Sequence, residues 1–305
     1  MKKTLLFFVL AAIIVVGCNQ PAEKETANEQ DSFTVAFLTD IHVQPEKNAI
    51  EGFNKAIAKV NELKPDLVIT GGDLVMDVLG TGYDRADSLY NIYDSLQAKF
   101  EMPVYNTLGN HEVFGLYKES GIDTIHPLYG KKLYEERVGP RYQSFDHKGW
   151  HFMILDGIGY TPERRYIGYI DEEQMNWIKE DLAGVNKDTP IAISVHIPFI
   201  NAGIQYYYGS LEENGPGAVI TNAKEVLELF NDHNLKLALQ GHLHWLEDIY
   251  IDNTHFIIGG AVSSNWWSGK RHGMEEGFLL LDFTADNFDW EYIDYGWEVA
   301  EKAEE

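Results

Sequence analysis

In the stretch FTVAFLTDIH, residues 33–42, a short apolar run is followed by a polar Asp-x-His motif. The same pattern, an apolar run that ends in polar residues, occurs again further along the chain. Apolar residues then recur at helical spacing over 49–63, before a second apolar run, 66–70, that ends in Gly-Gly-Asp. A helical pattern over 89–100 leads to a third run, 103–108, that ends in Gly-Asn-His-Glu. This β-α-β-α-β order predicts a largely parallel sheet with helices covering it.

The second half of the chain is richer in strand patterns. Strand patterns occur at 142–145, 151–155, 191–195, 235–239, 248–251, 255–258, 277–283 and 288–293, and helical patterns at 172–182 and 223–230. The strands at 191–195 and 235–239 again end in polar residues, His-x-Pro and Gly-His-x-His. We therefore predict a mixed α/β fold with two sheets and helices on the outside.

The composition excludes several classes of protein. Of 305 residues, 45% are hydrophobic and 24% charged, which is typical of a globular protein and not of a disordered, collagenous or many-pass membrane protein. Lys and Arg total 24 against 48 Asp and Glu, so the formal charge is −24, which argues against a protein that coats nucleic acid. A single cysteine excludes an intramolecular disulfide and a cysteine-rich zinc site.

The N-terminus predicts export. Two lysines precede an apolar run at 5–16, too short to span a bilayer comfortably, and the run ends in Gly17-Cys18. The ending resembles a bacterial lipobox, which implies cleavage before Cys18 and lipid attachment to its sulfur; an ordinary signal peptide or an uncleaved anchor are the alternatives. We expect a signal peptide at 1–17, a tether at 18–32, one domain at 33–297 and an acidic tail at 298–305. The location implied is the bacterial cell envelope, facing the periplasm or the exterior.

Five polar clusters follow the predicted strands. Because strand carboxyl ends share one edge in open α/β sheets, we expect their side chains to converge. Imidazoles, carboxylates and one amide oxygen suit two divalent metals, with Asp73 able to bridge them. Glycines at 72, 109 and 241 would let the chain turn sharply there. The clusters are Asp40-x-His42, Gly72-Asp73, Gly109-Asn110-His111-Glu112, His196-x-Pro198 and Gly241-His242-x-His244.

The set, in this order, resembles the calcineurin-like metallophosphoesterase superfamily. The resemblance implies two mixed β-sheets packed as a sandwich and flanked by helices. It implies that His111 is not a ligand but assists the leaving group, with Glu112 orienting it. Met76 stands where purple acid phosphatases carry a metal-binding tyrosine, so a purple centre is not expected. The implied ligands are Asp40, His42, Asp73 and His244 for the first metal, and Asp73, Asn110, His196 and His242 for the second.

This chemistry predicts a phosphoric ester hydrolase in which a bridging hydroxide attacks phosphorus. A phosphodiester is slightly favoured over a phosphomonoester, and the substrate would be a phosphorylated small molecule, a lipid headgroup or a glycan. The metals would be Mn, Fe or Zn, and the oligomeric state is left open. A metal-binding surface lipoprotein without turnover is the alternative from another class, and a two-metal hydrolase of a non-phosphate substrate is a third.

Long loops follow the polar clusters and carry aromatic residues. Tyr207, Trp266 and Trp267 could stack on a base, a sugar or a headgroup, and Arg271 could contact a phosphate or a carboxylate. The alternative is that the rings pack these loops against the core and that the basic residues are solvated.

Overall fold

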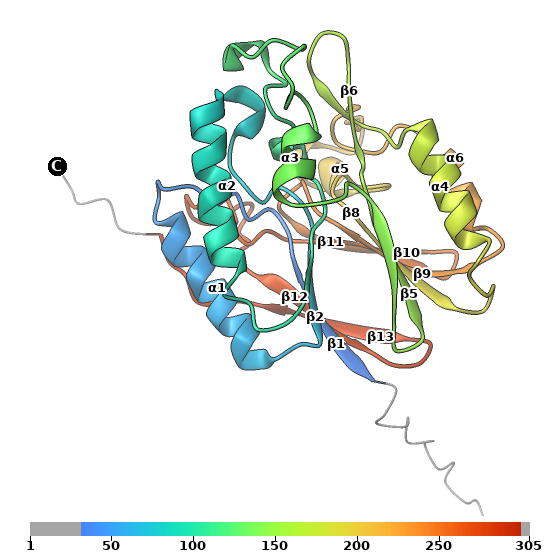
Figure 1. Ribbon diagram of the computed structural model, residues 1–305. Coiled ribbons are helices and arrows are strands. Elements are labelled where there is room, and N and C mark those ends of the chain that lie inside the picture. Colours follow the sequence, from blue (N-terminus) through green and yellow to red (C-terminus); the bar gives the residue numbers. More distant parts are fainter. Residues whose placement is uncertain (1–31, 300–305) are drawn as a thin grey trace, which may run out of the picture.

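The computed structural model of the protein describes residues 32–299, so the predicted signal peptide, Cys18 and most of the acidic tail lie outside it. Two mixed sheets pack face to face with helices on the outside, as predicted (Figure 1). In the first sheet, β1, β2 and β3 are parallel and β12 runs antiparallel to β1. Its strand order is β13 (Phe288–Ile293), β12 (Phe278–Phe283), β1 (Phe33–Leu38), β2 (Leu67–Thr70) and β3 (Val104–Tyr105).

The second sheet has a parallel centre and antiparallel edges. Its order is β10 (Leu246–Ile251), β11 (Thr254–Gly259), β9 (Asn234–Gln240), β8 (Pro190–Val195), β5 (Trp150–Leu155) and β4 (Gln143–His147). A separate hairpin, β6 (Ile158–Tyr160) with β7 (Tyr166–Gly168), stands beyond the sheets.

Helices cover the outer faces of the sandwich (Figure 1). In α1 (Ala49–Leu63), six small or apolar residues at helical spacing are buried: Ala49, Gly52, Phe53, Ala56, Ile57 and Val60. The remaining α-helices are α2 (Tyr83–Gln97), α3 (Lys132–Arg137), α4 (Glu172–Leu182), α5 (Gly203–Tyr208) and α6 (Ala223–Leu227). The short 3₁₀ helices are η1 (Val78–Gly80), η2 (Asn110–Glu112), η3 (Lys118–Ser120) and η4 (Glu228–Phe230).

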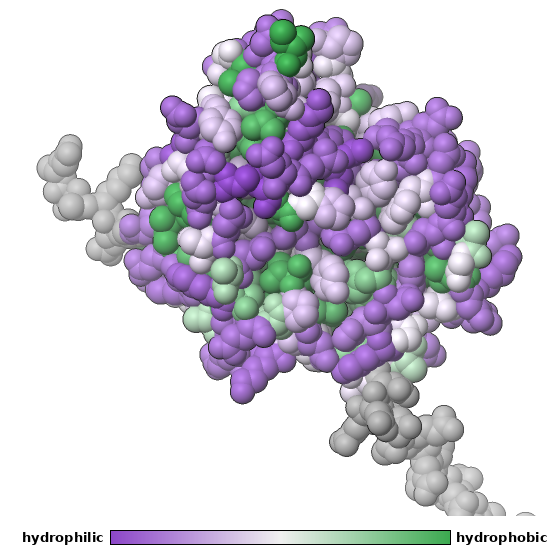
Figure 2. All heavy atoms as spheres, viewed as in Figure 1, coloured by the Kyte–Doolittle hydropathy of each residue, from purple (hydrophilic) through white to green (hydrophobic). Residues whose placement is uncertain are grey.

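Alternation along β1 divides the core into two layers. Val35 and Phe37 face the second sheet, whereas Ala36 and Leu38 face the helices. Burying both faces explains why the strands next to the centre are almost wholly apolar. The outer surface seen in Figure 2 is mostly hydrophilic, with hydrophobic residues in small groups. Within residues 32–299, no helix is both long and apolar enough to cross a bilayer.

One predicted strand is shorter than expected. The third apolar run was expected to pair over 103–108, but β3 contains Val104 and Tyr105 alone. Side-chain hydrogen bonds replace the sheet ladder beyond that point. Asn106 accepts from the Tyr93 hydroxyl at 2.6 Å, and the Thr107 amide donates to the Thr70 hydroxyl at 3.2 Å. The chain thereby leaves the sheet before it reaches Asn110.

Candidate metal centre

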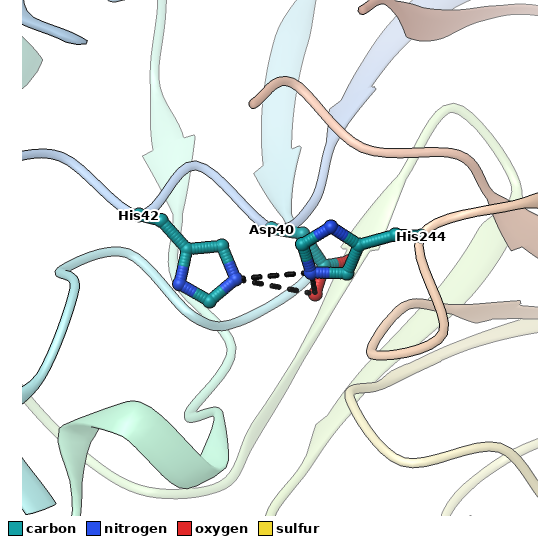
Figure 3. A group of neighbouring side chains, drawn as sticks. All are labelled: Asp40, His42 and His244. Carbon is teal, nitrogen blue, oxygen red and sulfur yellow. Dashed lines mark hydrogen bonds and ion pairs between the residues drawn. The ribbon is translucent and has the colours of Figure 1, made fainter. Parts of the chain in front are cut away.

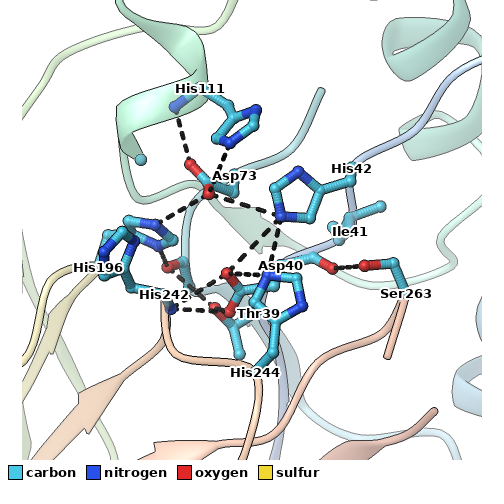
Figure 4. A network of polar contacts seen from close by, with 12 residues as sticks. Thr39, Asp40, Ile41, His42, Asp73, His111, His196, His242, His244 and Ser263 are labelled. Atoms are coloured by element: carbon cyan, nitrogen blue, oxygen red, sulfur yellow. Dashed lines mark hydrogen bonds and ion pairs between the residues drawn. The ribbon is translucent and has the colours of Figure 1, made fainter. Parts of the chain in front are cut away.

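The polar ends of strands from both sheets meet at one place (Figure 4). The loop after β1 pairs with the loop after β2, because the Asp40 amide donates to Gly72 O at 3.0 Å and the His42 amide to Asp73 O at 2.8 Å. After β8 and β9, the Gly241 amide donates to His196 O at 2.9 Å. From the sequence, the ligands were expected at one edge of a single sheet. In the structure, the carboxyl ends of strands from both sheets form the site together.

The first cluster contains Asp40, His42 and His244 (Figure 3). The Nε2 atoms of the two histidines lie 3.1 Å apart, and His244 Nε2 is 3.2 Å from Asp40 Oδ1. All three residues are buried. Their donor atoms therefore converge among buried side chains.

The second cluster contains Asp73, His196 and His242. His196 Nε2 lies 3.2 Å from both Asp73 Oδ2 and Asn110 Oδ1. The same Asp73 oxygen lies 3.5 Å from His42 Nε2, so this carboxylate stands between the two clusters. All seven predicted ligands are brought together, and each cluster presents three His or Asp donors. A third group of donors, His42, Asp73 and His111, overlaps both clusters, so His111 also lies within reach of a cation there.

Backbone carbonyls set the tautomers of two histidines. Nδ1 of His196 donates to Gly71 O at 2.7 Å, and Nδ1 of His244 donates to Ser264 O at 2.5 Å. The Nε2 lone pair of each ring is then directed into the centre, the arrangement that orients metal-binding imidazoles in proteins. The buried Nδ1 atoms of His42 and His242 have no hydrogen-bond partner within residues 32–299. His42 faces Asp40 and Asp73 through its other nitrogen, Nε2, whereas the unpartnered nitrogen of His242, a member of the second cluster, fits a cation ligand.

Charge in the centre favours donors with free lone pairs. Burial opposes ionisation of Asp40, but the neighbouring His244 and His196 lower the pKa of its carboxyl to about 2. Burial, together with His196, lowers the pKa of His242 to about 4, so that this imidazole is neutral. Asp73 outweighs burial and raises the pKa of His196 to about 9. A bound cation would take the place of that proton.

Strained backbone concentrates at the same residues. Five of the seven predicted ligands have positive φ, between 47° and 73°: Asp40, His42, Asp73, His242 and His244. Each costs on the order of 1–3 kcal/mol in a residue with a Cβ, and such strain clusters at functional sites. Gly72 also has positive φ, at 91°, as the expected sharp turn requires. Gly109 and Gly241 do not, and instead they allow close approach, since a Cβ would lie 2.2 Å from the Asp73 amide and 2.0 Å from Thr39 Oγ1.

Comparison with known proteins agrees with this geometry. The sequence profile described as calcineurin-like phosphoesterase matches residues 33–246. The chain belongs to the calcineurin-like phosphoesterase family. A protein of Xenorhabdus bovienii named as a probable cyclic nucleotide phosphodiesterase is 22% identical over 270 residues, covering 83% of this phosphoesterase and 96% of that protein. A Pseudoalteromonas protein with a similar name is 25% identical over 224 residues, covering 71% of this chain and 73% of its own length.

Solved structures share the fold of this phosphoesterase. A dimetal phosphatase from Danio rerio superposes with a TM-score of 0.57 at 13% identity, over 87% of this chain and 99% of that one. The purple acid phosphatase PPD1 from yellow lupin gives a TM-score of 0.51 at 15% identity, over 87% of this chain and 52% of that one. At these identities the likeness establishes the two-sheet fold alone.

The two residues after Asn110 have different surroundings in this phosphoesterase. His111 packs edge-on against His42 with ring centroids 4.5 Å apart, and its Nε2 lies 3.9 Å from Asp73 Oδ2. Its Nδ1 contacts the Met76 carbonyl. Glu112 was expected to orient His111, and that expectation is wrong. Its carboxylate instead accepts from the amides of Gly109, Asp73 and Val75 at 2.8, 3.0 and 3.1 Å, so it holds the backbone of the metal loops.

Trp267 was a candidate substrate-binding residue, but the structure shows the alternative, in which its ring packs the loop against the core. Its side chain is 1% exposed, and the ring packs against Gly52 of α1 and against Trp297. Trp266 does lie at the centre, half-buried, with its ring 4.5 Å from that of His244. Arg271 sits over Trp266 at 4.8 Å. Tyr207 is farther out and stacks on His272 at 4.1 Å.

Several supporting residues escaped the sequence analysis. Thr39 donates its hydroxyl to Asp40 Oδ2 at 2.7 Å, and its place beside the Asp-x-His motif could have signalled that role. Tyr166 packs edge-on against His242 with ring centroids 5.7 Å apart. It comes from the β6–β7 hairpin, and no spacing in the sequence connects that hairpin with the strand ends.

Proposed function

We propose that the protein is a two-metal phosphodiesterase. The observation that carries this proposal is the position of Asp73 Oδ2, 3.2 Å from His196 Nε2 and 3.5 Å from His42 Nε2, between two clusters that each suit a divalent cation. Asp40, His42 and His244 would hold one cation, and Asn110, His196 and His242 the other, with Asp73 shared. Mixed nitrogen and oxygen ligands suit Mn, Fe or Zn.

The bound cations would supply an activated water and neutralise charge on the phosphate. The residues of this chain supply the rest. Asp40 and Asp73 place two negative charges where cations are required. His111 is 20% exposed at the edge of the centre, where it can reach the oxygen of a departing alcohol, and we propose that it stabilises that oxygen without being a ligand. Glu112 keeps the Asp73 loop in place.

Two observations support a phosphodiester as the substrate. Two relatives that cover most of this chain are named as probable cyclic nucleotide phosphodiesterases. The centre also has side chains suited to substituents on both sides, since Trp266 lies against His244 and Tyr166 against His242. A monoester would use one side alone.

The test compares two chromogenic esters with the purified protein loaded with Mn or Zn. We expect metal-dependent cleavage of bis-p-nitrophenyl phosphate to exceed that of p-nitrophenyl phosphate, and an Asp73→Asn variant to cleave neither. The opposite preference would make the protein a phosphomonoesterase. Two bound metals with no turnover of either ester would instead support the surface metal-binding lipoprotein.

We also propose that Cys18 carries a lipid that anchors the enzyme in the bacterial cell envelope. The apolar run before Gly17-Cys18 supports this proposal. Metabolic labelling with a radioactive fatty acid should mark the wild-type protein and not a Cys18→Ser variant. Equal labelling of both, or of neither, would reject the anchor.

A further inference from the structure

The arginines of this acidic chain divide into two groups. The sequence contains six arginines. Four of them make ion pairs with carboxylates or hydrogen bonds with several backbone carbonyls. Arg85 pairs with Glu46 and Asp77, Arg137 with Asp87 and Asp94, and Arg141 with Asp156, Asp171 and Glu135. Arg164 donates to the carbonyls of residues 115, 116, 117 and 122.

Arg165 and Arg271 form the second group. Within residues 32–299, neither makes an ion pair with a carboxylate. Each guanidinium lies over an aromatic ring instead, Arg165 over Tyr117 at 5.3 Å and Arg271 over Trp266 at 4.8 Å. Arg165 also hydrogen-bonds with the Tyr117 side chain, and the remaining N–H groups of its five-donor guanidinium are left for a planar anion. In a chain of formal charge −24, two such groups without carboxylates are exceptional.

Trp266 and Tyr166 connect the two arginines with different halves of the metal centre, Trp266 as the ring under Arg271 and Tyr166 as the residue that follows Arg165. Trp266 carries Arg271 and lies 4.5 Å from His244 of the first cluster. Tyr166, the residue after Arg165, lies 5.7 Å from His242 of the second cluster. Burial raises the pKa of Tyr166 to about 12, and the charges of Tyr117 and Asp73 add to the shift. Tyr117, the ring under Arg165, is therefore a neighbour of Tyr166, the ring that packs against His242.

The segment that carries Arg165 is fixed in position. Arg164 fastens it to the 115–122 loop through four carbonyls. The Thr161 amide donates to Arg165 O at 2.8 Å and closes the turn of the β6–β7 hairpin. Glu163 is the nearest acid in sequence, but its carboxylate bonds with Thr161. The Arg165 side chain is therefore an exposed cation on a rigid support.

We propose that Arg165 binds an anionic group, a carboxylate or a further phosphate, on a substituent of the phosphodiester beyond the scissile phosphate. The inference rests on the proposed phosphodiesterase function and names the substrate class: a phosphodiester that carries an extra negative charge. Arg165 takes this group on the His242 half of the centre, whereas Arg271 lies on the His244 half. The chain carries a formal charge of −24, so a guanidinium without a carboxylate partner favours an anionic substituent over a neutral one.

The test uses two esters with the same leaving group, p-nitrophenyl propyl phosphate and p-nitrophenyl 2-carboxyethyl phosphate, whose arms differ by the carboxylate. Full-length protein loaded with metal should prefer the carboxyethyl ester. Arg165→Ala should lower kcat/KM for that ester by about tenfold, the worth of a hydrogen bond to a charged group. The loss should fall on KM and leave the propyl ester within about twofold, because the group binds without touching the reacting atoms.

Two further variants complete the design. Lys224→Ala removes an 84% exposed cation on α6 and should leave both rates unchanged. Arg271→Ala shows which half of the centre the carboxylate prefers. Equal cleavage of the two esters, an equal loss on both with Arg165→Ala, or a loss of the preference with Arg271→Ala alone would each overturn the assignment of Arg165. If the wild type cleaves neither ester, the proposed phosphodiesterase function fails instead, and with it the basis of the inference.

Discussion

The indole N–H of Trp267 donates to the main-chain carbonyl of His42 at 3.1 Å, across 225 residues of sequence. It shares this hydrogen with the Ile41 carbonyl at 3.0 Å. His42 has a φ of 47°, a conformation that a residue with a Cβ keeps only when its surroundings hold it. Trp267 is therefore a positioning residue for the Asp-x-His turn, which explains why it is buried and not available to substrate.

Replacing Trp267 with Phe removes this donor and keeps an aromatic ring. We expect metal affinity to fall by about tenfold, as for other groups that orient metal ligands from outside the coordination sphere. Titration of the metal-stripped protein with Zn would measure the change. Trp290→Phe is the matched control, because its indole donates at 3.3 Å to Asp248, away from the centre. An equal effect of the two variants would show that the Trp267 contact has no special role.

Helix α1 presses on the same tryptophan through Gly52. A Cβ at this position would lie 2.2 Å from the Trp267 ring, so the ring or the helix must move. We expect Gly52→Ala to destabilise the fold by about 1–3 kcal/mol, as overpacking does, despite the better helix propensity of alanine. The midpoint of urea unfolding measures this. Gly215→Ala, where a Cβ meets nothing within 4 Å, should shift it little.

The ligand set could be predicted because each ligand follows an apolar strand in the sequence. Asp40 and Asp73 stand two and three residues after the ends of β1 and β2, so local spacing already indicates one edge. The same logic accounts for the correct assignment of most helices and strands. It could not show that the edges of two sheets meet, since strand order across a sandwich depends on packing between distant segments.

Residues that hold the ligands were predicted poorly. Glu112 lies next to His111 in sequence, yet its carboxylate turns toward Asp73 and Val75 because it takes amides that the loops leave free. Trp266 and Trp267 are adjacent, yet one lies at the centre and the other in the core, and both have positive φ. The direction of a side chain in such a loop depends on tertiary contacts, which no periodicity encodes.

Asp73 and His111 should separate metal binding from turnover. Asp73→Asn removes the charge shared by both clusters and should lower the metal content and abolish turnover. His111→Asn should lower kcat by about 100-fold or more, the worth of a group that assists the leaving oxygen, while two metals stay bound. Metal analysis of the dialysed proteins, run beside kinetics, checks both. Loss of a metal in the His111 variant would make His111 a ligand, as its 3.9 Å approach to Asp73 Oδ2 also permits.

Chelation should destabilise the protein measurably. Four imidazoles and two carboxylates lie together, all of them buried except the half-buried His242, and five of the ligands have positive φ, so bound cations offset both charge and strain. At a free metal concentration 100 times Kd, binding adds about 2.7 kcal/mol to the free energy of unfolding. We expect Tm to fall on treatment with a chelator and to rise with added Mn or Zn in a concentration-dependent way. If Tm changes neither with the chelator nor with added metal, the protein has no specific cation site.

Glu112 offers a test of how a buried carboxyl behaves beside the centre. Burial and the charge of Asp73 raise its pKa to about 8, whereas the amides of Gly109, Asp73 and Val75 all donate to it and favour the carboxylate. We expect the carboxylate form to be required, because a glutamine would place an N–H₂ group against at least one of these donors. Glu112→Gln should then cost about 2 kcal/mol or more in the free energy of unfolding and weaken metal binding, since the Asp73 amide loses its anchor. Urea unfolding at pH 7 measures the first effect and metal titration the second, with the exposed Glu163→Gln as control. If Glu112→Gln is as stable as the wild type, the Glu112 side chain is a protonated acid in the native protein. Its negative charge is then not needed to hold the backbone of Gly109, Asp73 and Val75 in place.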